Sequence, residues 1–460
     1  MTEPLRTPRT AWDIWRVGRA GEPAIAPRQR ARLADLVAFA RERSPYYRRL
    51  YKGLPTRVTD VKRLPVVTKP ELMRNFDEWV TDPEATKRDV EAFVADESLV
   101  GSPYLGGHLV ATTSGTTGDP AVFLHDEGAL AVYNAIGYVR AMPALLSRHD
   151  LRRLLLGGAR AAAVYATGGH FLAVAVLERR LRARPWRAKM QRVFSVLAPL
   201  DELVGDLNAF GPALLASYPS MLDVLAREQE AGRLGIRPVL VSAGGETMTP
   251  EVRGRIEAAF GCPVRDVYGS SEAVGVTYEC GQRWLHVSAD WYVLEPVDRN
   301  YNPTPPGVAS HTVLATNLAN RVQPIIRYDQ GDSVTVRPDA CQCGSPLPAI
   351  RVVGRTDDTL SFQAPEGSEV RLPPLALGTV IEETQGVRRF QAIKTNPKTL
   401  SVRLETVPGA DDKAVWEAVD RRLGEFLSGR GLPSVAVERD RQAPKPNPVS
   451  GKFRQVWAEA

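Results

Sequence analysis

The segment ATTSGTTGDP, residues 111 to 120, places hydroxyl side chains and glycines in one turn after a strand-like run. Glycines let backbone amides approach a polyphosphate closely, and hydroxyl groups add hydrogen-bond donors. The segment differs from a P-loop of the GxxxxGK(S/T) type, because no lysine and hydroxyl pair closes it. It predicts a phosphate-binding loop, but an ordinary polar loop has the same composition. The residues concerned are Thr113, Ser114, Gly115, Thr116, Thr117 and Gly118.

A second chemically suggestive segment is DVYGSSEA, residues 266 to 273. Its aromatic ring, Tyr268, is suited to stacking on a base, and the carboxylate of Glu272 is the kind of oxygen ligand that magnesium prefers. The simpler alternative is a strand-to-helix turn with a capping serine and an exposed glutamate. Taken alone, the segment does not decide between the two.

The four cysteines of the chain are too few for a secreted disulfide scaffold. Three of them, Cys280, Cys341 and Cys343, lie in a turn-rich region together with His286, whereas Cys262 lies apart. Three thiols and one imidazole form the soft, four-ligand set that zinc binds tetrahedrally. We expect a structural zinc site here; the alternative is three reduced thiols and a surface histidine.

The elements that must position these residues alternate between strands and helices from about residue 105 to 330. The strand-like runs are HLVATTS, RRLLLGG, ALLASYP, PVLVSAGGE and PVRDVYG, with helical segments between them. This alternation predicts an α/β fold with mostly parallel sheets flanked by helices. In such sheets ligands gather at the carboxyl ends of the strands.

Further along the chain the pattern changes twice. Residues 284 to 353 alternate polar and apolar residues with Pro and Gly breaks, which predicts a β-rich subdomain over about 280–353. After Gly354 comes a new mixture of three strands (RFQAIKT, LSVRLETV, SVAVERD) and one clear helix (DDKAVWEAVDRRLGEFLSG). We therefore expect an N-terminal body, 1–354, and a small α+β C-terminal domain, 355–460. Near the N-terminus, ARLADLVAFARERSPYYRRLY predicts a helix followed by a loop.

Composition excludes several classes of protein. The 460 residues include 59 basic and 53 acidic side chains in an interspersed pattern, without the long basic stripe of a nucleic-acid-binding protein. No run reaches the ~18 uncharged apolar residues that a membrane helix needs, and the first residues lack the pattern of a signal peptide. We expect a cytoplasmic protein that binds neither nucleic acid nor membrane; its oligomeric state, a homodimer included, stays open.

Further motifs follow in order along the chain. They are VSAGGET (241 to 247), IIRYDQGD (325 to 332), VVGRTDDTL (352 to 360) and PNPVSGKFRQV (446 to 456). With the two segments above, this series resembles the acyl-adenylate-forming superfamily and is most similar to its phenylacetate-CoA ligase branch. The resemblance spans nearly the whole chain. It implies an ATP- and magnesium-dependent enzyme that activates a carboxylic acid as its acyl adenylate and releases pyrophosphate.

The resemblance also implies a role for each motif. The loop from Thr113 to Gly118 would hold the β- and γ-phosphates, Glu272 would bind magnesium, and Lys452 would bridge the substrate carboxylate and the α-phosphate. Asp357 would be the hinge of a mobile C-terminal domain. The remaining nucleotide-binding residues implied are Gly245, Glu246, Asp266, Tyr268, Gly269, Ser270, Ser271, Asp332 and Arg355. Some members of the branch resemble the Cys and His pattern of the expected zinc site.

The acid pocket is expected between the helix after the phosphate loop and two strand ends. In relatives this region corresponds to Tyr133, Ile136, Gly137, Ala243 and Gly244. Small residues beside a tyrosine favour a flat aryl or arylalkanoic acid, although Tyr133 and Ile136 at helical spacing also fit an ordinary core.

The acyl acceptor is expected to be coenzyme A. Ala121 stands where many superfamily members carry a lysine, although the phenylacetate branch also lacks that lysine. The departure that bears on the acceptor is the segment TLSFQAPEGSEVRLPPLALGTVIEE, which is longer than the turn that usually seats the acceptor. An amine, a hydroxyl or a carrier-protein thiol therefore stays open as acceptor. The interpretation from another class is a catalytically inactive nucleotide-binding regulator.

Overall fold

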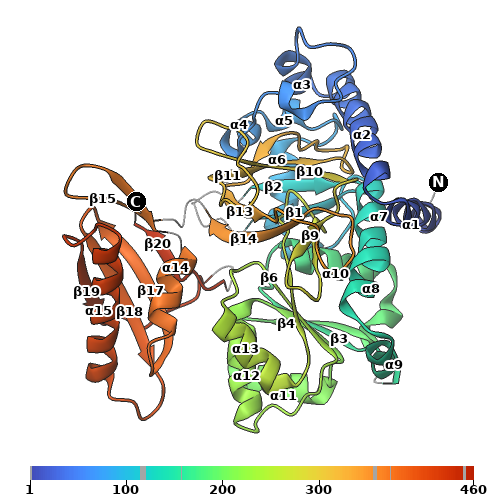
Figure 1. The fold of residues 1–460 in the computed structure, drawn as a ribbon. Coiled ribbons are helices and arrows are strands. Elements are labelled where there is room, and N and C mark those ends of the chain that lie inside the picture. The colour runs from blue at the N-terminus through green and yellow to red at the C-terminus, as the bar shows by residue number, and fades with distance from the viewer. Residues whose placement is uncertain are drawn as a thin grey trace.

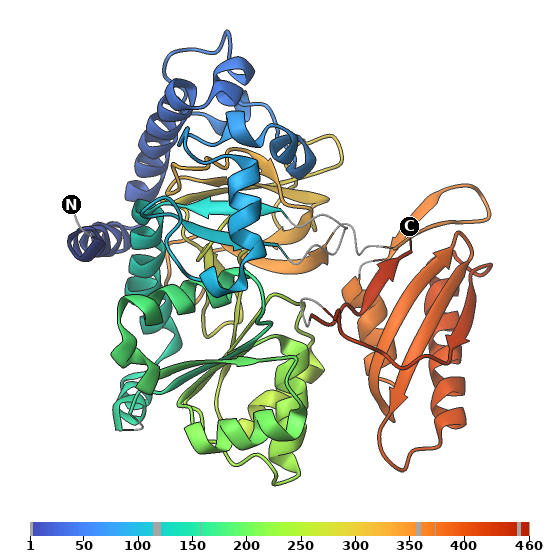
Figure 2. The same ribbon diagram turned by 180° about the vertical axis from the view of Figure 1, so that it is seen from behind.

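The computed structural model describes residues 3–113, 121–156, 158–355, 360–372, 374–448 and 452–459. It has a large body and a smaller unit beside it, which is orange to red in Figure 1 and is seen from behind in Figure 2. The predicted mixed α/β architecture is confirmed: a parallel sheet flanked by helices, further β-rich sheets, and a smaller α+β unit.

The lower half of the body in Figure 1 is a five-stranded parallel sheet in the order β4-β3-β5-β6-β7. Apolar side chains of the strands and of the helices that cover them, among them Val164, Leu215, Leu222 and Ile256, form one core. The strands are β3 (Ala161–Tyr165), β4 (Gln191–Ser195), β5 (Leu214–Ser217), β6 (Leu240–Gly244) and β7 (Val264–Val267). The connecting elements are α10 (Leu172–Ala183), η4 (Pro185–Lys189), α11 (Leu200–Phe210), α12 (Pro219–Glu230) and α13 (Pro250–Phe260).

Two of the predicted strands differ from expectation. HLVATTS does contain β1 (Leu109–Thr112), but β1 pairs antiparallel with β2 (Val122–His125) and lies outside the parallel sheet. The expected strand in RRLLLGG is wrong, because residues 152–156 belong to α9 (Arg148–Leu156). Among the described residues of this run only Leu154 is buried, so the short apolar run belongs to a largely exposed helix rather than to a buried strand.

The β-rich part contains two further sheets, in the orders β10-β11-β12 and β13-β14-β9-β8. Their apolar side chains share a core with α7 (Glu127–Ile136), which continues into the π-helix η3 (Gly137–Ala141) and α8 (Met142–Leu145). The strands are β8 (Thr277–Glu279), β9 (Leu285–Val287), β10 (Tyr292–Val297), β11 (Thr312–Asn317), β12 (Tyr328–Asp329), β13 (Asp332–Val336) and β14 (Ala349–Arg355).

The N-terminal helices, blue in Figure 1, pack on the β-rich part. The expected loop after Ser44 is instead a short helix, α3, because the Ser44 hydroxyl caps it by accepting from the Tyr47 amide. The Tyr47 hydroxyl and the Trp79 indole both donate to the carbonyl of Pro324. The elements are α1 (Glu3–Ala20), α2 (Glu22–Arg43), α3 (Pro45–Leu50), η1 (Val61–Arg63), α4 (Lys69–Arg74), α5 (Phe76–Trp79), α6 (Lys87–Ala95) and η2 (Glu97–Leu99).

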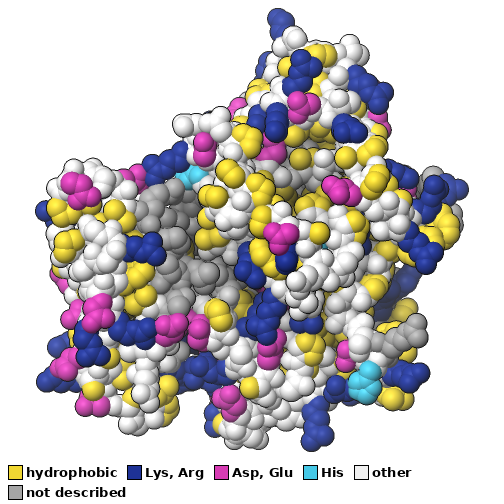
Figure 3. Space-filling model, viewed as in Figure 1, with side chains coloured by type: hydrophobic (Ala, Val, Ile, Leu, Met, Phe, Trp, Pro, Cys, Tyr) yellow, Lys and Arg dark blue, Asp and Glu magenta, His cyan; other side chains and the backbone are white. Residues whose placement is uncertain are grey.

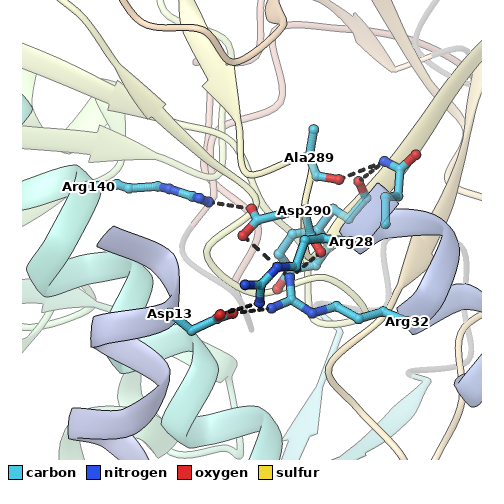
Figure 4. Close-up of polar contacts among 8 residues, drawn as sticks. Asp13, Arg28, Arg32, Arg140, Ala289 and Asp290 are labelled. Atoms are coloured by element: carbon cyan, nitrogen blue, oxygen red, sulfur yellow. Dashed lines mark hydrogen bonds and ion pairs between the residues drawn. The ribbon is translucent and has the colours of Figure 1, made fainter. Parts of the chain in front are cut away.

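A buried ion-pair network joins α1, α2 and the π-helix to the turn before β10. The fully buried Asp290 carboxylate pairs with Arg140 of the π-helix at 2.6 Å and with Arg32 of α2 at 3.4 Å. Figure 4 shows these two arginines approaching Asp290 from different sides, while Asp13 of α1 pairs with Arg32 and Arg28. The network therefore fixes the π-helix that continues the expected pocket helix.

The smaller unit has its own core and its own sheet, in the order β19-β18-β17-β20. Helix α14 was not expected from the sequence, whereas α15 and the three long strands were. The elements are β15 (Leu360–Gln363), β16 (Glu369–Leu372), α14 (Pro374–Glu382), β17 (Val387–Asn396), β18 (Thr399–Thr406), α15 (Asp412–Gly429), β19 (Ala436–Asp440) and β20 (Val456–Ala458).

The surface agrees with the interspersed charge pattern of the sequence: basic and acidic side chains alternate over the face seen in Figure 3. Within the described ranges no single helix is long and apolar enough to cross a membrane. One bent pair, Glu127–Leu145 and His149–Leu156, meets that test by length and composition.

Candidate active site

The carboxyl ends of the parallel strands carry a row of aromatic and small residues. Tyr165 ends β3, Tyr218 follows β5, Gly244 ends β6, and Tyr268 follows β7. The rings of Tyr165 and Tyr218 pack edge to face with their centroids 5.0 Å apart. Because parallel strands end at a common edge, these residues form one wall where ligands of such sheets bind.

Two glycines at the end of β6 allow neighbouring side chains to approach the backbone closely at this wall. A methyl group built on Gly244 would lie 2.8 Å from Cγ2 of Val267, closer than real side-chain contacts allow. Gly245 has a φ of 83° and its Cα faces the ring of Tyr218 and the side chain of Lys452. A larger residue at either position would therefore push the neighbouring elements apart.

Glu246 connects the body to the smaller unit. Its carboxylate accepts hydrogen bonds from the backbone amide of Ser220 (3.0 Å), from the Ser220 hydroxyl (3.1 Å), and from the backbone amide of Phe453 (2.6 Å). Burial raises the pKa of Glu246, and these hydrogen bonds oppose that effect. The contact with Phe453 places the adjacent Lys452 beside Gly245 and Tyr218.

Lys452 is thus held among the predicted site residues although it comes from the far end of the chain. Its Nζ lies 5.9 Å from the centroid of the Tyr218 ring. Burial lowers the pKa of Lys452, while the negative charges of Glu246, Asp332 and Glu272 raise it. The structure therefore brings together a buried ammonium group and three carboxylates that the sequence assigned to one site.

Tyr268 and Asp332 meet across the site. The Tyr268 hydroxyl donates to Asp332 Oδ2 at 2.8 Å and lies 3.0 Å from Oε1 of Gln330. Asp332 begins β13 and is the register partner of Arg355 at the end of β14. The pair of antiparallel strands thus presents a carboxylate and a guanidinium side by side, next to an aromatic ring.

The segment from Gly269 to Glu272 forms a tight turn at the same place. Backbone hydrogen bonds join Ser270 and Ala273, and the Ser271 hydroxyl donates to the Thr112 carbonyl at 3.2 Å. Glu272 is buried, and its Oε1 accepts from the Tyr328 hydroxyl at 2.9 Å. The turn therefore places a carboxylate beside the strand that leads into the predicted phosphate loop.

The two ends of that loop are joined by hydrogen bonds. The Thr113 amide donates to the Ala121 carbonyl at 2.9 Å, and the Ala121 amide donates to Oγ1 of Thr113 at 3.0 Å. The predicted phosphate ligands Ser114, Gly115, Thr116, Thr117 and Gly118 lie outside the described residues, as does the predicted hinge Asp357.

Asp266 lies on β7 next to Ala243 of β6. Burial and the nearby Glu279 raise its pKa to about 7. Glu279 itself forms a two-pronged pair with Arg253, at 2.9 and 3.1 Å, and accepts from the Asp266 amide. Asp266 is therefore a buried carboxyl behind the wall of strand ends.

The five predicted pocket residues do not form one cluster. Tyr133 and Ile136 of α7 belong to the core of the β-rich part, and Gly137 begins the π-helix. Ala243 belongs to the core of the parallel sheet, next to Gly244. The Tyr133 hydroxyl accepts from Asn317 at 2.8 Å, so its polar end is tied to β11. Tyr165 packs against both cores.

The predicted metal ligands do converge. The ligand atoms of Cys280, His286, Cys341 and Cys343 all lie within 4.8 Å of one another. The Cys280 and Cys341 sulfurs are 3.7 Å apart, close to the roughly 3.8 Å edge of a tetrahedron with ~2.3 Å zinc–sulfur bonds. His286 turns Nε2 toward Cys343, and its Nδ1 donates to the Leu347 carbonyl at 2.9 Å. This second hydrogen bond fixes the ring as in many zinc sites.

Sequence reasoning missed Tyr165, Tyr218, Tyr328 and Ser220. Tyr218 directly follows a strand that the pattern ALLASYP had predicted, so the rule on strand ends would have found it. Tyr328 lies within the motif IIRYDQGD. Nothing in the sequence indicated that Ser220 would share the carboxylate of Glu246.

Comparison with known proteins gives consistent results. The family model "AMP-binding enzyme" matches residues 108–297. A phenylacetate-coenzyme A ligase of Thermus thermophilus is 27% identical over 384 residues, which cover 78% of this chain and 77% of the relative.

Among solved structures, 2-hydroxyisobutyryl-CoA ligase in its postadenylation state superposes with a TM-score of 0.66 at 21% identity, covering 95% of this chain and 89% of that one. The same ligase in its thioesterification state gives a TM-score of 0.51 at 22% identity, with the same coverage. Both comparisons show that this chain shares the fold of that ligase.

Proposed function

From the membership of this chain in the acyl-adenylate-forming superfamily, in its phenylacetate-CoA ligase-like branch, we propose that it activates an aryl or arylalkanoic acid as the acyl adenylate and transfers it to coenzyme A. The chain is an adenylate-forming acid ligase. The observation that carries the proposal is the contact of Glu246 with Phe453, which places Lys452 of the small unit beside Gly245 and Tyr218 at the strand ends.

Adenylation requires a carboxylate to attack the α-phosphorus of ATP while pyrophosphate leaves. Lys452 holds its ammonium group where the acid and the α-phosphate would meet, which offsets the negative charge of both. Asp332 accepts from the Tyr268 hydroxyl and has the two oxygens needed to accept from a ribose diol. Positioning and charge neutralisation together account for most of the catalysis that such a step needs.

Glu272 is the residue of this chain that would hold magnesium. It is a buried carboxylate oriented by Tyr328, and it lies beside the strand that leads into the phosphate loop, which fits a cation that binds oxygen ligands and phosphate. The bound cation would supply charge neutralisation at the phosphates. The hinge at Asp357 and the motion of the small unit about it belong to the same proposal.

The aryl acid is proposed from the aromatic wall of the site. Tyr165 and Tyr218 form an edge-to-face pair next to Gly244 and Gly245, which leaves a flat surface beside Lys452. Aromatic rings favour such edge and face contacts with another ring. Tyr133, Ile136, Gly137 and Ala243 remain part of the proposed acid pocket, although they belong to two different cores.

An acceptor other than coenzyme A is the second candidate. The observation that favours it is the hairpin of β15 and β16 over residues 360–372, because the resemblance implies a shorter turn in this part of the chain. An amine, a hydroxyl or a carrier-protein thiol would then receive the acyl group.

The Cys and His cluster is proposed as a structural zinc site. Cys280 and His286 come from the β8–β9 hairpin, whereas Cys341 and Cys343 come from the connection between β13 and β14. Four protein ligands close the coordination sphere, so the ion would staple two parts of one sheet rather than take part in catalysis.

The test is release of pyrophosphate with a panel of acids, with and without coenzyme A. We expect acid-dependent release and a thioester product with at least one aryl acid. The variant Lys452→Ala should lose adenylation by roughly 100-fold or more, as expected for the loss of a charge contact in the transition state. Its matched control is Lys445→Ala, which removes an exposed lysine of the same segment. Near wild-type release by Lys452→Ala would refute the assigned role, and release unaffected by coenzyme A with no thioester would favour another acceptor.

A further inference from the structure

A cavity of about 220 Å³ lies between the body and the small unit. The body contributes mainly apolar side chains from the segment after β4 and from α12, and the small unit contributes Arg389, Pro446 and Phe453. The lining from the body is Val196, Leu197, Ala198, Leu200, Leu203, Ser220, Met221 and Val224. Ser220 and Phe453 also donate to the Glu246 carboxylate, so the cavity adjoins the proposed adenylation site.

Arg389 is the only charged residue in this lining. It lies on β17, and its guanidinium faces the Phe453 ring at 5.4 Å from the centroid. Among the described residues no carboxylate lies within ion-pair distance of it; Glu405 and Asp223 act on its charge from further away. Burial lowers the pKa of Arg389, which means that the guanidinium has lost hydration without gaining a direct counter-ion.

The neighbouring Arg388 shows the contrast. Its Nη1 pairs with Glu405 at 3.0 Å, and about a third of its side chain is exposed. Arg388 does not line the cavity, so Arg389 alone offers a cationic group to it.

We propose that this cavity is a second site for a small apolar carboxylate, with the ring against the leucine and valine side chains and the carboxylate against Arg389. An engineered cavity of ~150 Å³ is known to bind benzene, so 220 Å³ fits a single ring with a short acid. The ligand contacts both units, so it binds only while the small unit is docked with Lys452 at the strand ends.

The consequence for the reaction rests on the proposed function. If acyl transfer requires the small unit to leave this arrangement, a ligand in the cavity slows transfer and leaves adenylation unchanged. At a ligand concentration ten times its Kd, the undocked population falls about elevenfold. Because the ligand has the same chemistry as the proposed substrate, excess acid would inhibit its own thioester formation.

Benzoate binding measured by calorimetry tests the site without any need for turnover. We expect two classes of benzoate site in the wild-type chain and in Arg388→Met. In Arg389→Met the second class should bind at least tenfold more weakly, since a charge-assisted hydrogen bond is lost. Benzamide, which has no charge, should not occupy this class. Equal benzoate binding by wild type and Arg389→Met would overturn the proposal.

A second variant guards against misfolding of the first. Val224→Phe keeps Arg389 and fills the cavity, so it too should lose the second class; if it retains that class at wild-type affinity, the proposal is wrong. The kinetic arm compares pyrophosphate release with thioester formation at high acid concentration. Only thioester formation should be inhibited, and Arg389→Met should relieve this inhibition. If acyl transfer is equally fast with ligand bound, the ligand does not keep the small unit docked, and that part of the proposal is wrong. Failure of every acid to release pyrophosphate would refute the proposed function but leave the calorimetric result to decide the site.

Discussion

Replacing Glu246 by glutamine separates the contact that docks Lys452 from the chemistry of nucleotide binding. Oε1 of the carboxylate accepts from the Phe453 amide and the Ser220 hydroxyl, and Oε2 accepts from the Ser220 amide. A glutamine has one acceptor oxygen at this end. Its NH2 group must therefore face either the Phe453 amide or the Ser220 amide, both of which are donors.

The expected loss follows from this geometry. At least one hydrogen bond to a charged acceptor disappears, which is worth about 1.5–3 kcal/mol. If docking of Lys452 limits adenylation, kcat for pyrophosphate release should fall roughly tenfold to 150-fold. If the carboxylate of Glu246 serves docking, the KM for ATP should change little, whereas a raised KM would favour the nucleotide-binding role that the sequence implies for this residue. Hydrogen exchange at the Phe453 amide should become faster in the same variant.

The pH profile gives an independent check. In the proposed mechanism protonated Lys452 is the active form, so activity is expected to fall as pH rises through its pKa. Burial lowers that pKa from the ordinary value of 10.5, and the charge of Glu246 partly restores it. Removing this charge lowers the pKa further, so the alkaline limb of Glu246→Gln should move to lower pH. Glu257→Gln, whose partner is the exposed Arg283, is the matched control and should keep the wild-type profile. An unchanged kcat and an unchanged alkaline limb in Glu246→Gln would refute the docking role.

Three further predictions concern other parts of the molecule. Asp332→Asn should raise the KM for ATP about tenfold or more, since it removes the charge proposed to hold the ribose, and an unchanged KM would contradict that role. Cys341→Ser should lower the zinc content measured by metal analysis and lower Tm, whereas Cys262→Ser, in the separate core of the parallel sheet, should keep the metal; absence of zinc from the purified wild-type chain would remove this site. Asp290→Ala should lower the free energy of unfolding by about 3–5 kcal/mol, because it leaves the buried Arg140 without its counter-ion, and a loss below ~1 kcal/mol in denaturant titration would show the network to be dispensable.

The fold was predictable where the sequence pattern and the environment agree. The runs containing β5, β6 and β7 are rich in valine and leucine, and the three strands are followed by Tyr218, Gly245 and Tyr268; all three belong to the parallel sheet. β3 was missed because AAAVY has three alanines, which are depleted in strands, so its neighbours in the sheet decide its conformation. The run RRLLLGG failed for the opposite reason: its leucines suggested a buried strand, yet most of them are exposed on α9.

The sequence predicted which residues belong to the site, but it did not predict which residues contact one another there. The motifs identified Tyr268, Asp332 and Lys452, but the hydrogen bond between Tyr268 and Asp332 joins residues 64 positions apart. The contact of Glu246 with Phe453 spans 207 positions. The first contact depends on how two sheets of the body pack, and the second on how the two units are placed; local periodicity contains no information about either. The metal cluster was easier because its ligands belong to one sheet.

The hydrogen bonds of Glu246 are divided between the body and the small unit. If the small unit moved away, the Glu246 carboxylate would still have hydrogen-bond donors. Two of the three come from Ser220 of the body, and only the one from Phe453 comes from the small unit. On undocking, Glu246 keeps its two bonds to Ser220, and Lys452 regains hydration that compensates for the charge contact it loses. Separation of the small unit from the body would therefore break about one charge-assisted hydrogen bond at this point. A contact of that size is strong enough to position Lys452 for adenylation and weak enough to be broken in each catalytic cycle, as transfer of the acyl group to an acceptor would require.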